Sequence, residues 1–113
     1  MAQAVFVHAG ESIDYLPASA VAAGDVIVLS DLVGVAKLDV SANALGALAV
    51  SGVFDFAKQS GAAVTFAIGD KAYWDDANDV AVTTDGAGAN KLIGKAVQAA
   101  ADNDATVRVR MSQ

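Results

Sequence analysis

Few residues of this chain have side chains that could act as a nucleophile, a base or a metal ligand. His8 is the only histidine among the 113 residues, and there is no cysteine, which excludes a thiolate nucleophile and a thiolate zinc site. The serines stand in turn-like contexts, and no catalytic triad can be assembled around His8. We therefore expect His8 to be structural, and the sequence predicts no catalytic residue and no enzyme.

The acidic segment DDAND, residues 75–79, is the candidate for a calcium loop. An EF-hand loop requires the pattern D-x-[DN]-x-[DN]-G and a glutamate at its twelfth position. Counted from Asp75 the third residue is Ala77, and counted from Asp76 the fifth is Val80, so the pattern fails. We expect a solvated acidic turn and no metal site, with a weak cation contact as the open alternative.

Two lysine-containing segments resemble known binding motifs. The segment GANKLIGKA places Gly88 one residue too early for a phosphate-binding loop, and Ala96 replaces its hydroxyl residue. Nucleotide binding is therefore not predicted. Asp-Lys-Ala at 70–72 is similar to the modified lysine of lipoyl and biotinyl carrier barrels, but Lys71 opens a strand, as Val26 does earlier. A carrier barrel modified on Lys71 is the alternative function.

The balance of charge excludes further classes of partner. Seven Lys and Arg against thirteen Asp and Glu give a net charge of −6, whereas nucleic-acid binding needs a basic footprint. Only Arg108 and Arg110 lie close together in the sequence. No apolar run approaches the roughly 18 residues of a membrane span, and the start of the chain lacks the basic region of a signal peptide. We expect no nucleic-acid partner, no membrane partner and no cofactor.

The elements that position these residues are predicted to be strands. All the acidic residues except Glu11 are Asp, and the chain has ten Gly and abundant Val, a profile typical of strands joined by tight turns. The expected fold is all-β with at most a short helix. It is a small, compact barrel or sandwich of antiparallel hairpins in a single domain, residues 1–113, with an extended N-terminal arm at 1–17. Many apolar residues are Ala, so the core is thin and a partner subunit is expected to support it.

Apolar runs and alternation place the strands along the chain. Residues 91–100 suit either a strand or a short helix, since their Ala content favours a helix and Gly94 weakens one. The final strand alternates, which directs Val107, Val109 and Met111 inward. Strands are expected at 5–7, in a hairpin at 26–40, in one long strand at 45–56 with a bend at Gly52, and at 71–74, 80–84 and 105–111, with a loop at 58–62.

A faint internal repeat is visible in the order of these elements. AAGDVIVL at 22–29 matches AIGDKAYW at 67–74, and LVGVA at 32–36 matches LIGKA at 92–96. Two such halves could close a small barrel. Chance similarity in a chain rich in Ala, Gly and Val is the alternative.

The ordered set of segments resembles the bacteriophage capsid cement, or decoration, proteins over essentially the whole chain. The resemblance implies a compact β-rich protein that assembles as a homotrimer on the outer surface of the expanded icosahedral capsid. It further implies that the trimer bridges subunits of the major capsid protein in the virion. The matching residues are Gly10, Ile13-Asp14-Tyr15 and Pro17, then VAAGDVIVL, LVGVAKLDV and GALAVSGVFDF with Lys58, then AIGDKAYWDD, KLIGKAV and TVRVRM.

Two surfaces are expected to make these contacts. Extended arms supply edges for strand addition, so the arm is the expected capsid contact, and an ordinary edge strand of the same subunit is its alternative. The trimer interface is expected around Tyr73 or Trp74, with Arg108 and Arg110 pairing with Asp75 or Asp76 of a neighbour, and a solvated face is the alternative. The expected capsid contacts are Val5, Phe6, Val7, Ile13, Tyr15 and Pro17.

Overall fold

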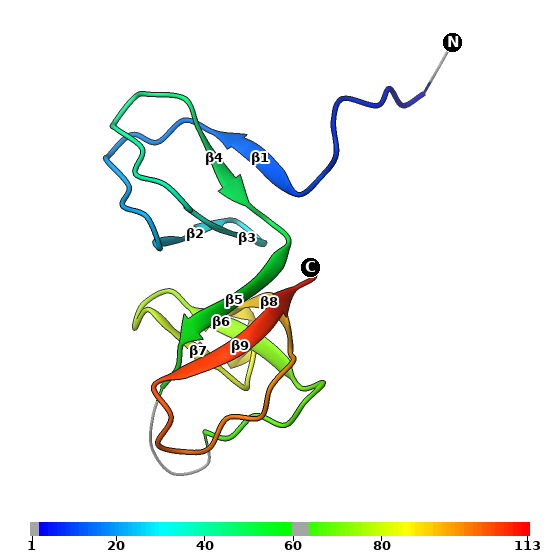
Figure 1. Ribbon diagram of the computed structural model, residues 1–113, viewed down its shortest axis with the longest axis vertical. Helices are drawn as coiled ribbons and strands as arrows, with labels where there is room; N and C mark the ends of the chain where they lie inside the picture. The colour runs from blue at the N-terminus through cyan, green and yellow to red at the C-terminus, as the bar shows by residue number, and fades with distance from the viewer. Residues whose placement is uncertain (1–2, 60–63) are drawn as a thin grey trace.

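The strands of the computed structural model, which describes residues 3–59 and 64–113, form two antiparallel sheets. The first sheet contains β1 (Ser12–Tyr15), β2 (Val26–Leu29), β3 (Leu32–Val35) and β4 (Gly46–Ala49), in the order β1-β4-β3-β2. The second contains β5 (Gly52–Ala57), β6 (Lys71–Asp75), β7 (Val80–Val82), β8 (Lys91–Ala96) and β9 (Thr106–Met111), in the order β5-β9-β8-β6-β7. A single 3₁₀ turn, η1 (Gly86–Gly88), is the helical element of the described residues. The all-β prediction is confirmed (Figure 1).

Of the two expected forms, a barrel or a sandwich of antiparallel hairpins, the described residues do not form a closed barrel. At the edges of the second sheet, Lys58 just after β5 forms an isolated parallel bridge to Ala81 of β7, and the Gln59 N–H donates to the Ala81 carbonyl at 3.3 Å. A closed barrel needs a continuous ladder between its first and last strands. Among the described residues, one isolated bridge joins the two edges, so the sheet curls without closing into a barrel.

Two strand predictions were wrong. The long strand at 45–56 is interrupted, because Gly52 adopts a φ of +112°, a conformation that favours glycine. This break sends β4 into the first sheet and β5 into the second (Figure 1). Residues 5–7 form no strand, because no strand of the described chain lies beside them to pair with. The loop expected at 58–62 falls partly outside the described residues.

The ambiguous segment at 91–100 contains strand β8. Gly94 explains why a strand is favoured at this place. A Cβ added to Gly94 would collide with the carbonyl oxygen of Arg110 and lie 2.8 Å from the Ser112 nitrogen. The close approach of β8 and β9 therefore requires a residue without a side chain. The inward direction of Val107, Val109 and Met111 in β9 is confirmed, since all three are buried.

The two sheets share one hydrophobic core. Val33 and Val35 of the first sheet pack in the same cluster as Phe56, Trp74 and Ile93 of the second. A smaller cluster lies on the other face of the first sheet and contains Val21, Ala36, Val40 and Leu48. Two polar contacts add to the junction: the Lys91 Nζ lies 2.9 Å from the Asp31 carboxylate, and the Gln113 side-chain amide hydrogen-bonds both backbone groups of Val33.

The internal repeat is real and is visible in matching hydrogen bonds. The turn glycine has a φ of +93° in both copies. In each copy the Asp side chain accepts a hydrogen bond from the N–H three residues earlier, at 3.0 Å for Asp25 and 2.9 Å for Asp70. The N–H of the turn glycine donates to the backbone carbonyl of Ala36 in the first copy and to that of Ala96 in the second. Chance similarity of sequence would not reproduce this set of bonds.

The repeat extends to the order of the strands. The order β1-β4-β3-β2 in the first sheet corresponds strand by strand to β5-β9-β8-β6 in the second. We call residues 12–49 the first repeat and residues 52–111 the second repeat. The second repeat carries an insertion between β6 and β8 that includes β7, which covers the outer edge of β6. The corresponding edge of β2 has no strand beside it in the described residues.

Candidate functional site

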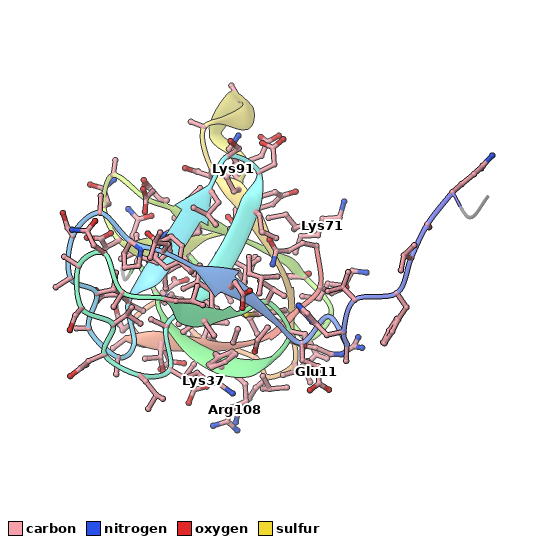
Figure 2. All side chains as sticks on the ribbon, turned by 90° about the horizontal axis from the view of Figure 1, so that it is seen from above. Glu11, Lys37, Lys71, Lys91 and Arg108 are labelled. Atoms are coloured by element: carbon pink, nitrogen blue, oxygen red, sulfur yellow. The ribbon has the colours of Figure 1, made fainter. Side chains whose placement is uncertain are left out.

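The N-terminal arm exposes an apolar triplet. Val5, Phe6 and Val7 are 77%, 84% and 82% exposed, and the arm leaves the body of the protein beside Glu11 (Figure 2). A run of three exposed apolar side chains on an extended backbone marks an interaction site more often than a neutral surface. The alternative, in which these three residues form an edge strand within their own subunit, is not seen.

The inner part of the arm is committed to its own subunit. Ile13 and Tyr15 lie in β1, which pairs with β4, and both pack against the smaller hydrophobic cluster. Pro17 is fully buried. The residues predicted for capsid contact therefore separate into an exposed group, residues 5–7, and a group that anchors the arm to the first sheet.

The aromatic and acidic residues around β6 have different environments. Alternation allows one of the two aromatic residues to face inward, and Trp74 does so with 4% exposure, whereas Tyr73 is half-buried. The Asp75 carboxylate accepts hydrogen bonds from the Ala77 N–H at 3.2 Å and from the Asn78 side chain at 2.8 Å. Asp76 accepts one from the Trp74 indole at 3.3 Å. The acidic segment is thus a turn stabilised by its own amides.

Arg108 and Arg110 project from the exposed face of β9. Arg108 pairs across the strands with Asp55, with Nε 2.9 Å from the carboxylate. This hydrogen bond lowers the pKa of Asp55 and raises the pKa of Arg108. Arg108 already has a partner within the chain, so a contact with a neighbour would have to share or replace Asp55.

A row of cations crosses the second sheet beside that pair, and no pattern in the sequence predicts it. Arg110 is opposite Lys95 on β8, and Lys95 is opposite Lys71 on β6. All three side chains are exposed, and like charges directly opposite each other on adjacent strands repel. Spacing along the sequence could not reveal the row, because the register of three strands places it.

Lys71, His8 and Lys58, which the sequence also singled out, have contacts that fit a role in the fold. Lys71 begins β6 and lies opposite Lys95 of the neighbouring strand β8, so it does not lie at the hairpin tip that a carrier lysine occupies. His8 hydrogen-bonds the carbonyl of Ala9 on the exposed arm. Lys58 is only 4% exposed, and its ammonium donates to the carbonyls of Gln59 at 2.9 Å and Asp102 at 3.0 Å.

A comparison with models of protein families assigns the chain to a family. The family model described as phage cement protein matches residues 7–111, a range that contains all the strands described above. The chain belongs to the phage cement protein family. No curated protein and no solved structure gives a significant match.

This membership gives the cement protein a structural role in the phage virion capsid. Of the exposed triplet, only Val7 lies in the matched range, as its first residue, and Val5 and Phe6 lie just before it. The three residues of the cation row all lie within the range. In residues 3–59 and 64–113, no helix is long and apolar enough to cross a membrane. Over the same residues, no group of three acidic or histidine side chains gathers as a metal centre.

Proposed function

We propose that this cement protein binds the outer surface of the expanded icosahedral capsid as a homotrimer and stabilises it by bridging major capsid protein subunits. The observation that carries the proposal is the family match over residues 7–111. The protein acts by binding and not by catalysis. Three modest contacts held in one trimer bind far more tightly than one contact alone. Selective binding to the expanded lattice stabilises that state over the alternatives.

The capsid contact in this proposal is the exposed part of the arm. Burial of apolar surface contributes about 25 cal/mol per Å², so a single Phe6 side chain supplies a substantial share of one modest contact. Ile13, Tyr15 and Pro17 contribute by fixing the point from which the arm departs, because they pack within the first sheet. The arm can then fold onto the capsid without disturbing the rest of the subunit.

The trimer contact in this proposal lies on the second sheet. The cations Arg110, Lys95 and Lys71 form a row, and Tyr73 lies beside it on β6. An acidic turn of a neighbouring subunit, with Asp75 and Asp76, supplies the complementary charge. Trp74 supports this surface from within the core, and Arg108 lies at its border with Asp55.

The test compares capsids with and without the purified protein. Light scattering measures the oligomeric state, cryo-EM of decorated expanded capsids shows the site, and calorimetry measures the capsid melting temperature. Phe6→Ser is expected to weaken capsid binding. The matched control is Ile68→Ser, which removes a comparably exposed apolar side chain, 71% exposed, that is not part of the arm. A monomer that leaves the capsid melting temperature unchanged would overturn the proposal, and an intact mass increased at Lys71 would favour the carrier alternative.

A further inference from the structure

We propose that the outer edge of β2 is a docking site for an extended segment of the capsid subunit, which adds to the first sheet as a further strand. The inference rests on the proposed function for the identity of the partner. It concerns a different part of the molecule from the arm, and its evidence comes from the internal repeat.

The second repeat shows what such a strand looks like. There, β7 pairs antiparallel with β6, with Tyr73 opposite Val82 and Trp74 opposite Ala81. By the repeat, β6 corresponds to β2, so Tyr73 corresponds to Val28. The first repeat lacks a counterpart of β7 among the described residues, and β2 is the last strand of its sheet. The same architecture is therefore complete in one repeat and open in the other.

The backbone of β2 is arranged to accept a strand. Leu29 and Leu32 flank the two-residue turn of the hairpin, and in antiparallel pairs the inward hydrogen bonds alternate from residue to residue. The N–H and C=O groups of Val26 and Val28 consequently point away from β3. Within the described parts of the chain, no protein group bonds to them. An unpaired edge of this kind is a template for strand addition.

A cleft beside this edge has room for the side chains of the added strand. Its volume is about 520 Å³, and its apolar lining includes Val26, Val35, Phe54, Phe56 and Trp74. These residues belong to the shared core or pack against it. An apolar side chain that entered from an added strand would therefore extend an existing core, which favours burial over an isolated surface contact.

Charge indicates that the strand comes from the capsid and not from the arm of another copy. Asp25 and Asp79 also line the cleft, so a complementary segment carries Lys or Arg. Residues 3–11 contain no Lys or Arg and end in Glu11, and the whole chain carries −6. A second copy of the arm would bring like charge to the rim, whereas a basic capsid segment would neutralise it.

The position of the edge gives the bridging mechanism a physical basis. β1, from which the arm departs, and β2 are the opposite edges of the first sheet. They are three strand spacings apart, or about 14 Å. The arm and the β2 edge can therefore hold two different capsid segments at once. One subunit would then act as a clamp even before the trimer multiplies its contacts.

The experiment removes one outward N–H from the edge. Val28→Pro deletes that donor but leaves the bonds to β3 in place, and Val28→Ala keeps the donor while losing the same packing. We expect Val28→Pro to bind expanded capsids at least about tenfold more weakly than Val28→Ala. Both variants should have the oligomeric state of the unmodified protein. Equal binding by the two variants would overturn the inference, and a change of oligomeric state with unchanged capsid binding would assign the edge to a second copy instead.

Hydrogen exchange of the unmodified protein keeps the test decisive if Val28→Pro fails to fold. The amides of Val26 and Val28 are expected to exchange more slowly on decorated capsids than in free protein. Unchanged exchange at these two amides, in protein that does bind capsids, would overturn the inference while leaving the proposed function intact. If the unmodified protein fails to bind capsids, the proposed function fails first, and the inference with it.

Discussion

Replacement of Gly94 by alanine tests the packing of β8 against β9. The added Cβ would overlap the Arg110 carbonyl oxygen and lie 2.8 Å from the Ser112 nitrogen. Both neighbours are backbone atoms held in a ladder, so no side-chain rotation can relieve the overlap. Overpacking typically costs 1–3 kcal/mol, and a backbone clash reaches the upper end or beyond. We expect Gly94→Ala to lower the free energy of unfolding by about 3 kcal/mol.

That loss is large for a domain of this size. Small domains are stable by only about 5–15 kcal/mol. An unfolding entropy of about 2.1 cal/mol/K per residue converts 3 kcal/mol into a fall of about 13 °C in melting temperature. Thermal unfolding followed by circular dichroism, together with urea denaturation, measures both quantities. The control is Gly10→Ala, because a Cβ at Gly10 has no atom within 4 Å and should leave the melting temperature unchanged.

The sign of the effect also separates strand from helix at this segment. If residues 91–100 formed a helix, alanine at position 94 would stabilise the protein by about 1 kcal/mol, because glycine is the poorer helix former. A Gly94→Ala protein that melts at or above the temperature of the unmodified protein would refute the strand assignment and the close approach of β8 to β9. A partial effect is expected for Gly34→Ala, where the nearest atoms belong to the Leu48 side chain.

Three further predictions concern polar contacts. Lys58→Met should lower the free energy of unfolding by about 1–3 kcal/mol in urea titrations, because buried carbonyls lose their donor. Asp25→Ala and Asp70→Ala should each cost about 1 kcal/mol, and the double variant should show the sum since the turns lie in different sheets. Arg108 lowers the pKa of Asp55, so the ionised pair stabilises the fold slightly. Above about pH 5 the unmodified protein should therefore have a slightly higher melting temperature than Asp55→Asn. This difference in melting temperature should be lost as acid protonates Asp55 below about pH 4.

Local patterns in the sequence predicted the strands whose burial alternates. The last strand is the clearest example, because Val107, Val109 and Met111 read as one face before any partner strand is known. The two Gly-Asp turns were equally legible, since a glycine at positive φ followed by a capping aspartate is a local arrangement. These features depend on neighbours within a few residues, which is why spacing alone identifies them.

Features that depend on register could not be predicted in this way. The break at Gly52 separates two sheets, yet one parity of apolar residues continues through it, so the segment reads as a single strand. The cation row of Lys71, Lys95 and Arg110 exists only because three strands align. The ion pair between Arg108 and Asp55 depends likewise on the pairing of β5 with β9. The candidate interfaces were therefore only partly visible in the sequence.

The repeat shows how the two sheets differ at their edges. The two repeats have the same strand order, and the insertion that contains β7 covers the β6 edge in the second repeat. In the part of the chain that the structure describes, the first repeat has an unpaired β2 edge, a smaller hydrophobic cluster of its own and the exposed arm. Its stability depends on the core it shares with the second sheet. In the proposed complex, the capsid lattice would supply a strand to β2 and would also bind the arm. The added strand would cover the edge of β2 as β7 covers the edge of β6 in the second repeat. The thin, alanine-rich core predicted from the sequence would then gain its missing support from the capsid.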